Sequence, residues 1–130
     1  MKLTHNSGMV FSLIAVAALI LAEKSQAQDP TKVDSKHYRV VFENDSVRVL
    51  RITYGPHEKS IMHEHPNAVA VFLTDLNVRF TLPDGKTVDS KEKAGQTIWT
   101  PAGKHLPENL NDKPLELILV ELKPHKAKTK

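Results

Sequence analysis

The stretch NVRFTLPDGKTVDSKEK, residues 77–93, carries the pattern that decides the fold class. Its first part alternates apolar and polar side chains, which is the period of a strand with one buried face. The apolar positions are Val78, Phe80 and Leu82. The dipeptide Asp84-Gly85 follows and is typical of the tight turn of a β-hairpin. Residues 87–93 return with few apolar side chains, so we expect a hairpin whose second strand lies at an edge or on the surface.

Similar short segments occupy most of the chain on either side of this hairpin. We predict further strands at 38–42, 46–54, 61–65, 68–74, 94–104 and 114–123. The last of these is apolar at nearly every position, which predicts burial on both faces. The polar segment 105–113 is predicted to be a loop. Because no part of residues 28–130 shows the period of 3.6 typical of a helix, we expect one all-β domain, a sandwich or barrel, over 38–123.

The N-terminal segment has the features of an export signal. Residues 9–22 form an apolar run that is shorter than the roughly 20 residues needed to span a membrane. Ser25 and Ala27 then place small residues at the two positions that a signal peptidase reads. We predict a signal peptide over 1–27 and a bacterial protein located in the periplasm or secreted, without membrane contact after cleavage. An uncleaved anchor and a buried N-terminal helix are the alternatives.

The two segments that flank the predicted domain are polar. Residues 28–37 are expected to be a flexible lead-in, and 124–130 a flexible basic tail that keeps the protein in solution. The formal net charge is only +3, and no basic face with interleaved aromatic residues is evident. We therefore expect no nucleic-acid partner.

The absence of cysteine limits the reactions and metal ligands that this chain can provide. The chain has no cysteine, which excludes disulfides, thiolate catalysis, cysteine zinc ligands and a lipoprotein anchor. An edge strand on a small β domain invites pairing with a second copy, so a homodimer is one arrangement that the sequence allows.

The segment IMHEHP, residues 61–66, indicates where the chemistry lies. Side chains two apart on a strand share a face, so His63 and His65 can point at one ion while Glu64 faces the other way. Imidazole nitrogens are the commonest protein ligands of transition metals. A third ligand is needed, and His105, in PAGKH after a predicted strand, is the candidate. The alternative is a pair of exposed histidines at a strand end.

The spacing around these histidines resembles the two motifs of the cupin superfamily. GPHEKSIMHEHP supplies Gly55, His63 and His65 of the first motif, with a longer spacer before the histidine pair than in the family. GQTIWTPAGKHLPEN supplies the second and more specific motif, with a shorter spacer before its histidine. Its matching positions are Gly95, Pro101, Gly103, His105 and Asn109. The resemblance covers residues 55–109 and implies a small cupin-type β-barrel, a jelly-roll-like double-stranded β-helix.

One departure from the family pattern bears on function. The glutamate of the first motif should fall at position 69 or 70, where this chain has Val69 and Ala70. The ligand set implied by the resemblance is therefore three histidines, holding one divalent transition metal: Fe, Zn, Mn, Ni or Cu. Three neutral ligands leave the ion its full charge and open positions for water, oxygen or an anion.

Two functional hypotheses follow from the histidines and this departure, beside a third in which the protein is a structural β-barrel whose histidines have no function. The first is metal-dependent chemistry on a small anionic molecule, with a dioxygenase as the first reaction class and an isomerase or lyase as the second. The second is a non-catalytic module that binds a small ligand or a metal, because loss of the carboxylate can also mark a cupin that binds without catalysing.

Three further residues are candidates for the surroundings of the metal or for the pocket. His57 precedes the histidine pair and could act as a base, although a solvated loop histidine is the simpler interpretation. Trp99 lies before the second motif's proline and either lines the pocket or packs in the core. Asn109 closes the second motif and is more often a stabiliser of a loop or turn than a ligand.

Overall fold

The computed structural model describes residues 28–125, and within them two antiparallel sheets account for most of the chain. The strands are β1 (Tyr38–Glu43), β2 (Val47–Tyr54), β3 (His63–His65), β4 (Ala68–Phe72), β5 (Leu76–Thr81), β6 (Thr87–Glu92), β7 (Thr97–Thr100), β8 (Gly103–Asn109) and β9 (Leu115–Leu122). One sheet has the order β1-β2-β9-β4-β7 and the other β3-β8-β5-β6. A short helix, α1 (Pro30–Val33), precedes them. The all-β class predicted from the sequence is confirmed.

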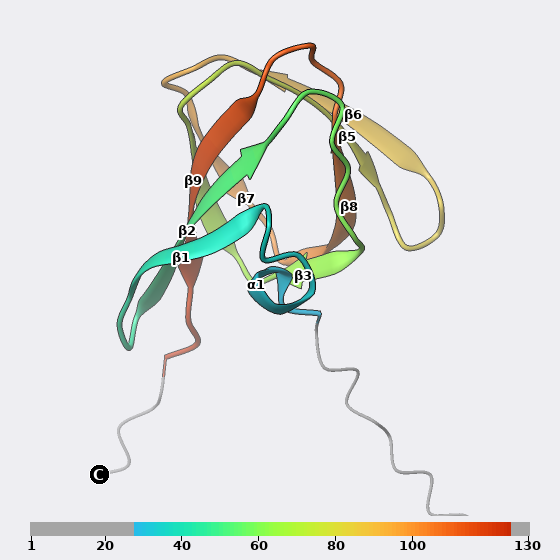
Figure 1. The fold of residues 1–130 in the computed structure, drawn as a ribbon. Coiled ribbons are helices and arrows are strands. Elements are labelled where there is room, and N and C mark those ends of the chain that lie inside the picture. Colours follow the sequence, from blue (N-terminus) through green and yellow to red (C-terminus); the bar gives the residue numbers. More distant parts are fainter. Residues whose placement is uncertain (1–27, 126–130) are drawn as a thin grey trace, which may run out of the picture.

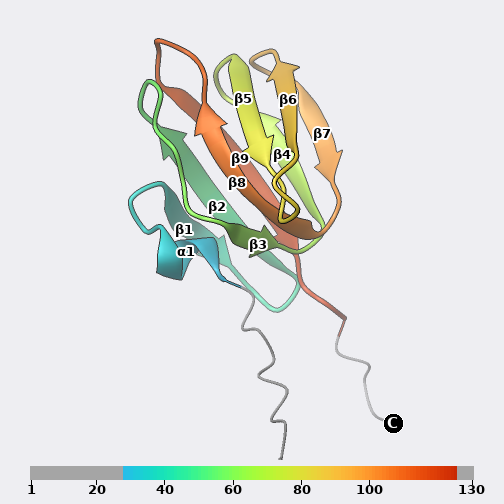
Figure 2. The same cartoon turned by 90° about the vertical axis from the view of Figure 1, so that its right-hand side faces the viewer.

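The two sheets lie face to face and enclose the core (Figure 1). Most of the core comes from alternate residues of three neighbouring strands of the larger sheet, which is the periodicity of strands with one buried face. These residues are Leu50, Ile52 and Tyr54 of β2, Ala68, Ala70 and Phe72 of β4, and Leu115, Leu117 and Leu119 of β9. The smaller sheet adds Leu76 and Val78 from β5. In Figure 2, α1 and β1 lie on one side of the molecule and β6 and β7 on the other.

The hairpin predicted at 77–93 is present as β5 and β6, which pair from Leu76–Glu92 to Thr81–Thr87. Gly85 takes a φ of +83°, a left-handed conformation that glycine adopts without strain. Within residues 28–125, Gly95 shares this conformation, with a φ of +85°, in the turn before β7. Both turns therefore depend on the residue type that the sequence provides.

The prediction of a loop over 105–113 is wrong for its first part, because β8 extends to Asn109. Its residues 103–105 pair with β3, and residues 106–109 pair with β5. The second half also contacts the segment before β3, through a bridge between Lys59 and Glu108. Pro107 lacks a backbone donor, but its carbonyl oxygen accepts a hydrogen bond from the Ser60 backbone N–H at 2.9 Å. Pairing with residues distant in sequence outweighs the low strand propensity of this segment.

The segment 28–37, expected to be flexible, instead folds onto the domain. Asp29 caps α1 by accepting a hydrogen bond from the Thr31 backbone N–H at 2.9 Å, and Pro30 occupies the first turn, where a missing N–H costs nothing. Asp34 and His37 are buried and hydrogen-bonded at 2.7 Å. A short polar segment gives no periodic signal of such packing.

The described residues contain no helix long and apolar enough to cross a membrane. The predicted signal peptide over 1–27 lies outside the described residues, as do positions 126–130 of the predicted tail. Both remain predictions from the sequence.

We predict that Leu50→Ala lowers the free energy of unfolding by about 2–5 kcal/mol, because Leu50 is fully buried and truncation leaves a cavity. Urea denaturation would measure the change. Val41→Ala is the control on the neighbouring edge strand, where the side chain is exposed, and should shift stability by no more than about 0.5 kcal/mol. Equal effects of the two substitutions would contradict the assignment of the core.

Candidate metal centre

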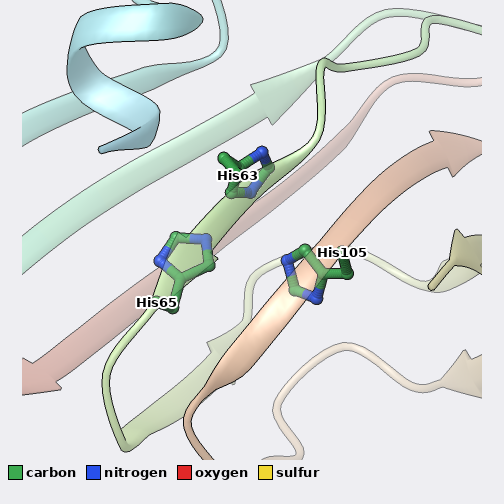
Figure 3. Close-up of side chains that lie close together, drawn as sticks. All are labelled: His63, His65 and His105. Carbon is green, nitrogen blue, oxygen red and sulfur yellow. The ribbon is translucent and has the colours of Figure 1, made fainter. Parts of the chain in front are cut away.

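Pairing of β3 with β8 brings the three predicted histidines together. His63 lies directly opposite His105 in the antiparallel register, and His65 lies two residues further along the same face of β3. Figure 3 shows the three rings converging between the two strands. One nitrogen from each ring can be chosen so that all lie within 4.8 Å of one another. Glu64 points the other way, 3.9 Å from the Lys104 ammonium, as the alternation predicts.

Hydrogen bonds fix which nitrogen each β3 histidine turns to the centre. The Nδ1 of His63 donates to the carbonyl oxygen of Ile61 at 2.7 Å, which leaves its Nε2 as a lone-pair donor. The Nδ1 of His65 bonds to a carboxylate oxygen of Glu121 at 2.6 Å. The Nε2 of His63 is buried and has no hydrogen-bond partner among the described residues. A buried nitrogen of this kind needs a partner, and a metal ion is a suitable one.

The protonation state of the cluster also suits a metal. Burial lowers the pKa of His63 to about 4, and the neighbouring His65 contributes to the decrease. Burial likewise lowers the pKa of His105 to about 3, with further contributions from His65 and His63. Both rings are therefore neutral at pH 7, which is the form that coordinates metals. The cluster is compatible with one divalent transition metal held by three imidazoles.

Glu121 of β9 is part of this site, and the sequence analysis did not find it. It is 1% exposed, and its second oxygen accepts a hydrogen bond from Arg48 Nε of β2 at 2.6 Å. Arg48 also donates to Asp29 at 2.6 Å, which links the centre to the cap of α1. Burial raises the pKa of Glu121, but the bonds to His65 and Arg48 outweigh this effect and leave it below its usual value. Glu121 is thus an anion that orients His65, as carboxylates commonly do for metal-binding histidines.

The sequence signal for Glu121 lies in the two-residue period of β9. Three leucines at 115, 117 and 119 face the interior, and Glu121 continues this series. The opposite positions of the strand are only partly buried, so the prediction that this strand is buried on both faces is wrong. A carboxylate that continues an apolar face is buried, and a buried carboxylate needs a polar partner. The position of Glu121 in this series therefore indicates a buried polar contact.

The position of the absent family glutamate is occupied by a small side chain. Ala70 is buried on the interior face of β4, while Val69 is only partly buried on the other face. Ala70 lines a cavity of about 490 Å³, to which His65 and His105 also contribute. No carboxylate of the described residues joins the group of three histidines, and the nearby Glu121 bonds to His65 instead.

The other sequence candidates lie at three different places. His57 is in an exposed loop with a φ of +57°, and its Nε2 bonds to Asp112 at 2.6 Å rather than to the histidine group. Trp99 lines the cavity where it meets solvent and is 55% exposed. Its placement agrees with the pocket interpretation and not with core packing.

Asn109 stabilises a loop rather than the centre. Its side-chain amide donates to the carbonyl oxygens of Gly55 and Lys113, each at 2.9 Å. Its side-chain oxygen accepts from the backbone N–H of Asn111 at 3.0 Å. The fully buried amide therefore holds the loop after β2 against the loop that precedes β9.

Comparison with known proteins relates this fold and site to a superfamily. No protein-family model matches the sequence, and no curated protein matches it. Among solved structures, it resembles a cupin domain from Bordetella pertussis, with a TM-score of 0.63, 25% identity, and coverage of 67% of this chain and 92% of that one. A double-stranded β-helix protein from Klebsiella pneumoniae has a TM-score of 0.53 and 20% identity, covering 69% and 77%. A cupin family protein from Methanocaldococcus jannaschii has a TM-score of 0.53 and 18% identity, covering 65% and 77%.

The fold is therefore the double-stranded β-helix, and by this fold the chain is a member of the cupin superfamily. The family resemblance read from the two sequence motifs is confirmed. The histidines of both motifs come together as the resemblance implies, while the carboxylate of the first motif has no counterpart in the cluster.

We predict that the metal-free protein loses stability as the pH falls from about 6.5 towards 4. In this window the unfolded chain protonates its histidines, whereas His63 and His105 stay neutral in the folded state. The unfolded state then binds up to two more protons, so the free energy of unfolding rises with pH. Urea denaturation at several pH values would measure the slope.

The comparison variant for this pH experiment is His63→Asn/His105→Asn, which removes both titrating groups. It should show a smaller slope between pH 4 and 6.5, while other titrating groups contribute equally to both proteins. Identical slopes would contradict the neutral, buried state of the two rings.

We predict that Glu121→Gln weakens metal binding by about 10–100-fold, because the neutral amide orients His65 less firmly and leaves Arg48 with Asp29 as its remaining charge partner. Competition with a chromophoric chelator would measure the affinity, and thermal unfolding would report the change in fold stability. Glu116→Gln is the matched control, since Glu116 lies on the same strand and pairs with Arg51 at the surface. Equal affinities in the two variants would contradict the role of Glu121.

Proposed function

We propose that this protein is a metal-binding cupin that carries out metal-dependent chemistry on a small molecule, with oxygenation as the first reaction class and isomerisation or elimination as the second. The observation that carries the proposal is the convergence of His63, His65 and His105, two of which are held as neutral ligands by burial. The adjoining cavity provides space for the molecule.

The chain's own residues would perform separate tasks at this site. The three imidazoles would hold the ion and leave its remaining positions facing the cavity. Glu121 keeps His65 in the required tautomer, and the carbonyl of Ile61 does the same for His63. A bound divalent metal would supply Lewis acidity or redox capacity. The apolar walls would exclude bulk water and strengthen electrostatic effects at the ion.

A second candidate function is binding without catalysis, and the position of Ala70 favours it. This position faces the cavity and has no carboxylate to share charge or protons with an ion or substrate. Among the described residues that line the cavity, the groups that titrate are two tyrosines, two metal-facing histidines and Lys104. A sensor or carrier of a small ligand or of the metal itself needs no further group.

We also propose that the protein acts outside the cytoplasm, on the basis of the predicted signal peptide over 1–27. In such a compartment the supply of metals, together with the affinity order of nitrogen ligands, would decide which ion fills the site.

The test is elemental analysis of protein that has been expressed from the full sequence and purified without chelator or affinity tag. We expect close to one transition-metal ion per chain. We also expect the mass of the purified chain to match residues 28–130, as cleavage before Gln28 predicts. The double variant His63→Ala/His105→Ala should lose the metal. His57→Ala, which changes an exposed histidine outside the group, should retain it.

The results separate the hypotheses. Iron that cycles between oxidation states supports the oxygenase, and inert zinc supports binding alone. If neither wild-type protein nor the double variant contains metal and both are equally stable, the metal proposal is wrong.

A further inference from the structure

The cavity beside the metal centre is apolar along most of its length. Its lining includes six apolar residues from four strands: Ala70, Phe72, Val78, Phe80, Ile98 and Leu117. Tyr38 and Tyr54 also line the cavity, and their hydroxyl groups bond to each other at 2.5 Å. A ligand with polar groups along its body would leave them without partners against these walls. The walls therefore favour an apolar body.

Part of the cavity wall belongs to the metal centre. His65 and His105 line it there, and Phe80 packs against the His105 ring with centroids 4.9 Å apart. An ion held by three neutral imidazoles keeps its full positive charge, which attracts an anionic oxygen. The apolar surface and the ligand-binding nitrogens thus meet within a few ångströms. This part of the cavity favours an anionic head group.

Two strands that end the sheets also contribute to the cavity wall. β6 and β7 are each at an edge and are not paired with each other. Val88 of β6 and Trp99 of β7 both line the cavity, and they are 52% and 55% exposed. Figure 2 shows these two strands on the side away from α1 and β1. Val88 lies directly opposite Phe80 in the pairing of β5 with β6, and Phe80 packs on His105, so the apolar wall continues from the histidines to the exposed rim.

We propose that the cavity takes an amphipathic molecule, with an anionic oxygen group at the three histidines and a largely apolar body that extends to the rim at Val88 and Trp99. This inference rests on the proposed function, because the head group requires the metal. A volume of about 490 Å³ lies within the range of roughly 300–1,000 Å³ of pockets that enclose small molecules.

The test is calorimetric titration of zinc-loaded protein with the straight-chain carboxylates acetate, butanoate, hexanoate and octanoate. Burial of one methylene contributes about 0.8 kcal/mol, equivalent to about fourfold in affinity. We expect affinity to rise two- to fourfold per methylene until the chain reaches the rim. Affinity that is independent of chain length, in protein that holds zinc, would overturn the inference and leave the proposed metal function intact.

Two exposed aromatic residues provide a matched pair of variants. Trp99 is at the rim on edge strand β7, and Phe42 is on β1, the other edge of the same sheet, outside the cavity lining. They are 55% and 53% exposed, so neither truncation should affect the fold strongly. Trp99→Ala should weaken octanoate binding at least threefold and leave acetate binding unchanged, whereas Phe42→Ala should change neither. Equal effects on octanoate would overturn the placement of the apolar body.

A metal-free arm distinguishes failure of this inference from failure of the metal proposal. Trp99 is the sole tryptophan of the chain, so its fluorescence reports on occupancy of the rim. Metal-free protein titrated with 1-butanol, 1-hexanol and 1-octanol should bind the longer alcohols more tightly. This result in protein that fails to take up zinc would refute the metal proposal and support the apolar body. Absence of chain-length dependence in both arms would overturn the inference.

Discussion

The packing of three histidine rings against one another is the constraint on which the rest of this structure depends. The cross-strand position of His63 and His105 forces two rings together, and the two-residue period of β3 adds the third. Apolar surroundings then make protonation costly, as the low pKa values of His63 and His105 show. The same surroundings leave the buried Nε2 of His63 without a hydrogen-bond partner among the described residues, which favours a cation there.

A chain of charged contacts joins this centre to distant parts of the fold. Glu121 connects His65 on the smaller sheet to Arg48 on the larger one, and Arg48 continues to Asp29 beside α1. Removing Arg48 from this chain leaves the buried carboxylate of Glu121 without its guanidinium partner, which is more costly than loss of an exposed ion pair. The orientation of one ligand is thus coupled to the packing of both sheets.

A second polar group supports the other β3 histidine. Asp34 bonds to both His37 and Ser60, and the Ser60 hydroxyl lies 3.4 Å from the Nδ1 of His63. His37 also stacks on Tyr54, with ring centroids 4.3 Å apart. Together with the backbone bond from Glu64 to Gln28, these contacts bind the segment before β1 to the strand that carries the ligands. This segment is therefore part of the site's support rather than a lead-in to the domain.

The sequence by itself determined the all-β class, the hairpin at 77–93 and the shared face of His63 and His65, because alternation and turn residues act over a few positions. The motif spacing also identified His105. Only the tertiary structure decided that 103–109 is a strand, that α1 packs on the domain and that Glu121 serves His65. These features depend on partners far apart in the chain: 73 positions separate Arg48 from Glu121, and 56 separate His65 from Glu121. Local periodicity shows which way a side chain faces, whereas its partner is determined by how the sheets pack.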